Sequence, residues 1–292
     1  MLLPNDPTLH QRLGVIERLQ RHPAEALVHF EQAFNQNPDF IEAFEQIAAV
    51  LVSQGKVPQA RERIERQLVM DPQNPRLHNL LGGVLAQLQK LVEAEAEYKK
   101  AIILDGTLLI SYANLGELYA RQGKLEQAIK EFEAILAKNP SELSVLMSLG
   151  LLHERKNDFD QARAKYEEIL KINPNFAPAA NNLAWILLEY GGDQERAVSY
   201  AETAWRASPQ DPHIVDTLGW AYFRKQMYSK AAGLLKEAVD KLPEDPVVLY
   251  HYGMAQYWND NNAEAKKSLT KFLTLSPKDR NAGEARKILA AL

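Results

Sequence analysis

Apolar residues recur at helical spacing in paired blocks along the chain. Within residues 109–142, one apolar stripe is followed by a turn at Gly123 and Lys124 and by a second stripe of Ala128, Phe132, Ile135 and Leu136. The first stripe has members at i, i+3, i+4 and i+7: Tyr112, Leu115, Gly116 and Tyr119. This periodicity places the four side chains on one face of a helix, and glycine adopts the positive φ of a tight turn at little cost. The pattern predicts two amphipathic helices joined as a hairpin.

Prolines divide the chain into segments of nearly constant length. Their spacings are 34, 68, 34, 35, 34 and 34 residues, and the 68 is two periods with Gly106 at the missing position. These prolines are Pro38, Pro72, Pro140, Pro174, Pro209, Pro243 and Pro277. Because proline lacks an N–H group and disfavours the α conformation in the preceding residue, each is expected to mark a helix end. The predicted unit is therefore a repeated helical hairpin.

The repeated unit resembles the tetratricopeptide repeat (TPR), whose 34-residue pattern is Leu-Gly-x-x-Tyr, then Ala-x-x-x-Phe, then Pro. Eight copies start at residues 7, 41, 75, 109, 143, 177, 212 and 246. The resemblance implies an all-α fold, a right-handed α-solenoid of eight helix-turn-helix repeats over residues 7–280. A solenoid needs a cover on its last apolar face, and residues 281–292 are predicted to supply it as a capping helix.

The start of the chain also fits the repeat pattern. Pro4 lies 34 residues before Pro38, so residues 1–6 are interpreted as the remnant of a preceding repeat. We therefore expect the array to begin inside a longer protein, with a trimmed natural start as the alternative.

In the TPR family, the first helix of each repeat lines a concave groove with its positions 2, 5, 6, 9, 12 and 13. At these positions repeats six to eight carry aromatic and amide side chains, and Trp258 is among them. The predicted ligand-binding residues are Asn181, Asn182, Trp185, Asp216, Trp220, Phe223, Tyr250, His251, Met254 and Tyr257. A secondary, polar groove is predicted at Asn79, Asn114, Glu117 and Arg121. Trp205, on a second helix, is expected to pack in the core.

Two interpretations of the aromatic residues remain open. Exposed aromatic side chains supply large contact areas and dominate interface hot spots, which favours binding of an extended protein segment. The alternative is core packing, because Trp185 and Trp220 share one repeat position and Tyr257 and Trp258 adjoin the predicted cap.

Composition narrows the range of functions. The 292 residues include 34 Lys and Arg against 38 Asp and Glu, a net charge of −4, and no cysteine. An acidic balance argues against a nucleic-acid partner, and the lack of cysteine removes thiol catalysis and thiolate metal ligands. Apolar runs are too short for a membrane span, and no catalytic or phosphate-binding motif occurs. We expect no enzyme activity, no cofactor, no metal and no direct membrane insertion.

Finer resemblances bear on the partner. The fifth repeat positions lack the lysine with which TPR arrays clamp acidic chaperone tails, so that role is rejected. Residues 181–185 and 216–222 resemble the closing repeats of large bacterial TPR proteins, some of them envelope lipoproteins linked to exopolysaccharide export. The resemblance implies a bacterial source and a periplasmic or envelope location, with the cytoplasm as the alternative.

Three functions follow from these observations. The first is a non-catalytic protein–protein interaction scaffold that binds a partner segment in the groove, chiefly in repeats six to eight. The alternatives are a structural self-assembly module of a longer solenoid and a carbohydrate-binding module for a polysaccharide.

Overall fold

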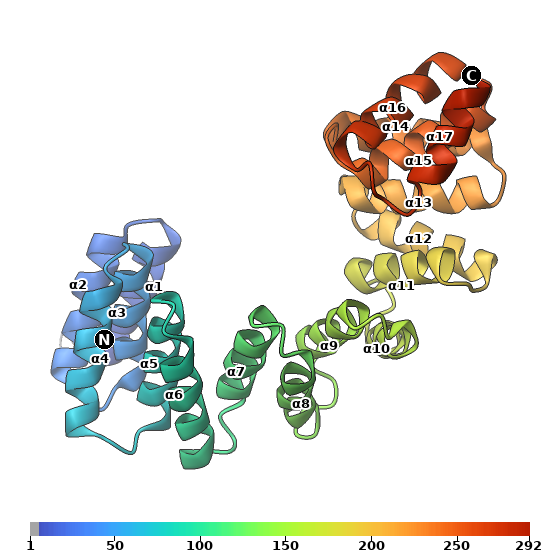
Figure 1. Ribbon diagram of the computed structural model, residues 1–292. Helices are drawn as coiled ribbons and strands as arrows, with labels where there is room; N and C mark the ends of the chain where they lie inside the picture. The colour runs from blue at the N-terminus through green and yellow to red at the C-terminus, as the bar shows by residue number, and fades with distance from the viewer. Residues whose placement is uncertain (1–5) are drawn as a thin grey trace. The chain divides into compact units, whose positions relative to one another are not determined.

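The computed structural model describes residues 6–292, and its regular secondary structure in that range is entirely α-helical (Figure 1). The predicted repeat remnant with Pro4 lies outside the described residues, except for Asp6, which caps the first helix. The helices are α1 (Pro7–Leu19), α2 (Pro23–Gln36), α3 (Ile41–Ser53), α4 (Val57–Met70), α5 (Pro75–Gln87), α6 (Leu91–Leu104), α7 (Leu109–Arg121), α8 (Leu125–Leu136), α9 (Leu143–Arg155), α10 (Phe159–Ile172), α11 (Ala177–Glu189), α12 (Gln194–Ala207), α13 (Pro212–Arg224), α14 (Tyr228–Lys241), α15 (Pro246–Trp258), α16 (Asn262–Leu275) and α17 (Ala282–Ala291). None of the helices in the described range is both long and apolar enough to cross a membrane.

Consecutive helices pack in pairs, from α1 with α2 to α15 with α16. Helices end close to the prolines as predicted: α4 ends two residues before Pro72, and α10 ends two residues before Pro174. Asn74, Asp211 and Asp245 each accept a hydrogen bond from the first turn of the following helix and so fix its start. The predicted all-α repeat solenoid is confirmed. The first helices start at the residues given above for the eight repeats, and we keep that division of the chain as a proposal.

Glycine in the first helix allows several of the hairpins to pack closely. A Cβ atom on Gly150 would lie 2.4 Å from Cε1 of Tyr166, and one on Gly82 would lie 2.7 Å from Cε1 of Tyr98. No side chain fits at these distances, so the aromatic ring of the second helix lies directly on the backbone of the first. The predicted turn glycine Gly123 has a φ of +74°, the left-handed conformation for which glycine suits a tight turn.

The contacts between helices divide the chain into two compact units. In the sequence, the boundary between these units lies between Pro140 and Ser141. In the C-terminal unit the first helices α11, α13 and α15 contact one another in succession. No contact of that extent joins α12 to α14, or α14 to α16, within the described residues. The first helices are therefore spaced more closely than the second helices, which puts them on the concave side of this unit. In the N-terminal unit α3, α5 and α7 contact one another in the same way.

Helix α17 covers the end of the C-terminal unit, where it packs against α15 and α16 (Figure 1). It buries Ala282, Ala285 and Ile288, three of the apolar residues that suggested a capping helix. Helix α17 thereby covers the apolar face of the last hairpin, which would otherwise be exposed to water.

Candidate functional site

The predicted aromatic groove is more deeply buried than expected. Five of its residues are only 3–6% exposed: Asp216, Trp220, Tyr250, His251 and Met254. The expectation that these five side chains present open surfaces is wrong, because α13 and α15 lie close enough for their inward rings to pack on one another. The other five predicted residues are half-buried: Asn181, Asn182, Trp185, Phe223 and Tyr257. A role in ligand binding stays a prediction for all ten.

Trp220 lies at the centre of a stack of rings on the concave side. Its indole is parallel to Phe223, with ring centroids 4.6 Å apart, and nearly parallel to His251, with centroids 4.1 Å apart. His251 is held by Asp216, whose carboxylate lies 2.9 Å from Nδ1. Because both faces of the indole are covered, Trp220 forms the floor of the site and offers no open ring face.

Glu189, at the end of α11, links this stack to the loop before the cap. Nε1 of Trp220 donates a hydrogen bond to Oε1 of Glu189 at 2.7 Å. Arg280, 91 residues further along the chain, donates to the other carboxylate oxygen of Glu189. Nη1 of Arg224 lies 3.9 Å from Oε1 and donates at 2.7 Å to the carbonyl of Leu188. One buried carboxylate therefore connects the first helix of the sixth hairpin to the end of the unit.

Tyr250 links α15 to the capping helix. Its hydroxyl donates a hydrogen bond to Glu284 of α17 at 2.7 Å. Burial raises the pKa of the Tyr250 phenol, and the negative charges of Glu284, Glu189 and Asp279 raise it further. The carboxylates of Glu189 and Glu284 therefore lie close to this end of the concave side, where Arg224 and Arg280 also lie.

A pocket of about 450 Å³ opens above the ring stack. Its lining comes from the first helices of the last three hairpins, the start of α14 and the cap: Glu189, Trp220, Phe223, Arg224, Gln226, Tyr228, Tyr250, His251, Met254, Trp258, Asn281 and Glu284. Trp258 stacks on Tyr228 with centroids 5.5 Å apart and is 52% exposed, so it forms an accessible wall. The pocket combines an apolar floor, an open indole and carboxylates, and such a combination suits a side chain with an apolar stem and a polar end.

The pocket includes residues outside the predicted set. Three of them could have been predicted from their position in the repeat. Glu189, Arg224 and Trp258 occupy the thirteenth position of their repeats, which is one of the inward positions of the family. Tyr228 and Glu284 lie on a second helix and on the cap, where the rule for first helices says nothing. Whether these two residues line the pocket depends on how the cap packs.

Five of the predicted residues do not line this pocket: Asn181, Asn182, Trp185, Asp216 and Tyr257. Trp185 packs edge-on against Tyr190, with centroids 5.4 Å apart, and also edge-on against Phe159. Asn182 donates a hydrogen bond to the hydroxyl of Tyr166 at 3.2 Å, and Asn181 lies beside it. Tyr257 lies edge-on against Trp258. Asn182 and Trp185 thus stabilise the packing of α11 on its neighbours.

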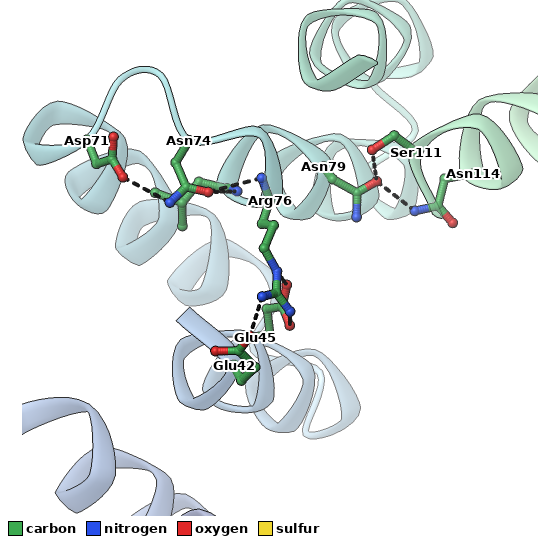
Figure 2. A network of polar contacts seen from close by, with 9 residues as sticks. Glu42, Glu45, Asp71, Asn74, Arg76, Asn79, Ser111 and Asn114 are labelled. Atoms are coloured by element: carbon green, nitrogen blue, oxygen red, sulfur yellow. Dashed lines mark hydrogen bonds and ion pairs between the residues drawn. The ribbon is translucent and has the colours of Figure 1, made fainter. Parts of the chain in front are cut away.

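Asn79 and Asn114, two of the residues predicted for the polar groove, belong to a network of polar contacts in the N-terminal unit (Figure 2). Oδ1 of Asn79 accepts hydrogen bonds from Nδ2 of Asn114 at 2.9 Å and from Ser111 at 3.2 Å. On the same helix as Asn79, Arg76 is paired with Glu42 and Glu45. Asn114 also lines a pocket of about 190 Å³ together with Glu117 and Arg121, which form an ion pair one helical turn apart. Three of the four predicted residues therefore share one small polar pocket.

Trp205 does not pack in the core, contrary to the sequence-based expectation. Its side chain is 37% exposed and lines a pocket of about 540 Å³ over α12, α13 and α14, with Leu218, Tyr222 and Leu234. The repeat position that usually holds a core leucine faces outward here. This pocket lies on the side of the second helices, away from the concave ring stack. Across residues 6–292, no three His, Cys, Asp or Glu side chains gather in a way that could hold a metal ion.

Comparisons with known proteins agree with this architecture. Family models described as tetratricopeptide repeat match residues 18–84, 114–178, 165–198 and 247–279. No curated protein matches the sequence significantly.

Among solved structures, a chain of the APC/C hetero-tetramer Cut9–Hcn1 is similar, with a TM-score of 0.62 and 16% identity over 92% of this chain and 52% of that one. The present chain thus spans about half of that relative. A tetratricopeptide repeat protein from Parabacteroides merdae has a TM-score of 0.58 and 19% identity over 85% of this chain and 98% of that one. PilF of Pseudomonas aeruginosa has a TM-score of 0.61 and 16% identity over 73% and 96% of the two chains. At these identities the likeness concerns the fold.

Proposed function

Because this chain is a tetratricopeptide repeat protein, we propose that it is a non-catalytic scaffold that holds a segment of a partner protein on the concave side of its C-terminal unit. Proteins of this repeat family generally mediate protein–protein interactions. The observation that carries the proposal is the pocket above the Trp220 ring stack, with its open wall at Trp258. Large aromatic walls around a desolvated floor are typical of the anchor sites that dominate binding energy.

The ring stack is held firmly in place, which favours the binding of a partner segment. Trp220 is fixed on both faces and by its hydrogen bond to Glu189, so little conformational entropy remains to be lost when a ligand binds. A partner side chain that enters the pocket would cover the half-buried Phe223 and lie against the indole of Trp258. Burial of that apolar surface supplies the affinity, whereas the carboxylates at the rim supply selectivity.

The polar pocket of the N-terminal unit is proposed as a second, weaker contact for the same partner. Asn79 and Asn114 use one amide atom each in their mutual hydrogen bond, and within the described residues their other amide atoms have no partner. An amide nitrogen and an amide oxygen match the carbonyl and N–H groups of an extended peptide. The polar surface here offers little apolar area, so we expect it to add selectivity more than affinity.

Carbohydrate binding is less well supported by the ring geometry. Stacking on a sugar needs an aromatic face that is open to solvent. The indole of Trp220 has both faces covered, so such stacking would depend on Trp258. Trp185 lies edge-on between Phe159 and Tyr190. The protein-scaffold hypothesis is therefore the one that we develop.

Affinity capture with two matched tryptophan variants tests the proposal. The unchanged chain, Trp258→Ala and Trp205→Ala serve as baits, since both indoles are partly exposed and they lie in different pockets. A partner of the concave pocket should be retained by the unchanged chain and by Trp205→Ala, and should lose about 2 kcal/mol of binding free energy with Trp258→Ala. Circular dichroism checks that all three fold equally well.

The opposite pattern contradicts the proposal. Loss of the captured protein with Trp205→Ala and retention with Trp258→Ala would place the interaction on the second helices.

A further inference from the structure

One charged residue from outside the lining contacts a carboxylate of the concave pocket. The lining carries two carboxylates, Glu189 and Glu284, and one guanidinium, Arg224, while His251 is paired with Asp216. Arg280 supplies the second guanidinium through its ion pair with Glu189. Without Arg280, the Oε2 atom of Glu189 would lose its ion-pair partner.

The two partners of this ion pair differ in their access to solvent. The Glu189 side chain is 12% exposed, whereas that of Arg280 is 53% exposed. Arg280 comes from the loop between α16 and α17, and its guanidinium lies 5.9 Å from the ring of Tyr190. A buried carboxylate is costly to leave unpaired, but an exposed guanidinium returns to water readily. Arg280 is therefore the replaceable member of the pair.

The other groups near Glu189 contact its Oε1 atom. Arg224 donates at 2.7 Å to the carbonyl of Leu188 and keeps Nη1 3.9 Å from the Glu189 carboxylate. Trp220 supplies a single neutral donor, on Oε1. Oε2 of Glu189 is consequently the position that a cation must fill, and Arg280 shows that a guanidinium fits there.

We propose that the pocket recognises an arginine side chain of the partner segment, and that this side chain takes the place of Arg280 on Glu189. The inference rests on the proposed function, and it specifies the chemistry of the partner. Arginine fits better than lysine because its planar guanidinium can donate to a carboxylate oxygen while it stacks on an aromatic face. Trp258 offers such a face at the pocket wall. Arg280 acts as an internal competitor that keeps Glu189 neutralised until the partner arrives.

Defined peptide pools test the proposal before any natural partner has been identified. Two fluorescent decapeptide pools differ only at a fixed central residue, arginine in one and citrulline in the other, with the remaining positions randomised. Citrulline keeps the shape and hydrogen-bonding groups of arginine but carries no charge. Each pool is passed over the immobilised full chain and over Glu189→Gln, Arg280→Ala and Trp258→Ala, with circular dichroism as the check on folding. Gln at position 189 keeps an acceptor for Trp220.

The expected result is a charge preference that depends on Glu189. The arginine pool should be retained at least about five-fold more strongly than the citrulline pool on the unchanged chain. Arg280→Ala should raise arginine retention several-fold, because the competitor is gone. Glu189→Gln should remove the preference, and higher salt should weaken it.

Two results would overturn the inference, and they differ in what they say about the proposed function. Equal retention of both pools, lost with Trp258→Ala, would show a peptide-binding pocket without selection for arginine. Retention of neither pool by the unchanged chain would count against the arginine site and against peptide binding in this pocket together. Arginine preference that survives Glu189→Gln would place the recognition at another carboxylate and would also overturn the inference.

Discussion

Single glycines in the first helices have opposite roles at neighbouring positions. Gly82 and Gly150 face an aromatic ring of the second helix at distances that exclude any side chain, whereas a Cβ on Gly83 would meet the Tyr98 hydroxyl at an ordinary 3.6 Å. The same substitution should therefore have opposite effects at the two kinds of site.

We expect Gly150→Ala to destabilise the protein by about 1–3 kcal/mol, because the new methyl group overlaps the ring of Tyr166. Gly83→Ala should stabilise it by up to about 1 kcal/mol, because alanine has the higher helix propensity and finds room. Urea unfolding followed by circular dichroism measures both. A neutral Gly150→Ala would mean that the hairpin tolerates a wider separation than its packing indicates.

Glu154 predicts a pH dependence of stability. Its carboxyl group accepts a hydrogen bond from the Tyr166 hydroxyl at 2.5 Å, and burial raises its pKa above the ordinary value of 4.5. The folded state thus binds this proton more tightly than the unfolded chain does, so the contribution of Glu154 to stability falls as pH rises from about 4.5 through the folded pKa.

The Glu154→Gln variant should lack this component of the pH dependence. Between pH 4 and pH 7 we expect its free energy of unfolding to fall less, or rise more, than that of the unchanged protein, as measured by urea unfolding at each pH. Parallel curves for the two proteins would show that Glu154 titrates alike in the folded and unfolded states.

At the scale of whole elements, sequence periodicity predicts the helices well and the exposure of their inward faces poorly. The helix starts and ends follow from proline and cap residues that act within one turn, so they can be inferred locally. Burial of Trp220 and Tyr250 depends instead on the spacing of α13 and α15 and on the position of α17. That spacing is set by contacts between repeats, which a pattern within one repeat does not contain. The pocket residues Tyr228 and Glu284 were missed for the same reason.

The hydrogen bond between Tyr250 and Glu284 ties the capping helix to the site. We expect Tyr250→Phe to loosen α17 by about 1 kcal/mol, which would speed hydrogen exchange of the α17 amides by roughly five-fold if they exchange through local opening. The control is Tyr222→Phe, which removes a hydrogen bond of the same length, to Glu202 of α12. Equal exchange in α17 for both variants would show that apolar packing alone holds the cap.

At the scale of the molecule, the pocket lies entirely within one compact unit. All of its lining residues fall between Glu189 and Glu284, and the C-terminal unit begins at Ser141. Stability in repeat proteins comes from each repeat and its immediate neighbours, so a fragment that keeps whole hairpins and the natural cap can fold without the rest. A fragment of residues 141–292 should therefore unfold cooperatively and keep the ring stack intact.

This fragment also separates the contributions of the two units to binding. If the concave pocket supplies most of the affinity, the fragment should bind the captured partner within about three-fold of the full chain, since hot-spot contacts dominate binding energy. It should discriminate less between that partner and unrelated peptides, because the polar groove with Asn79 and Asn114 belongs to the other unit. Isothermal titration of fragment and full chain gives both quantities. A fragment that folds but binds at least ten-fold more weakly would place the main binding energy in the N-terminal unit.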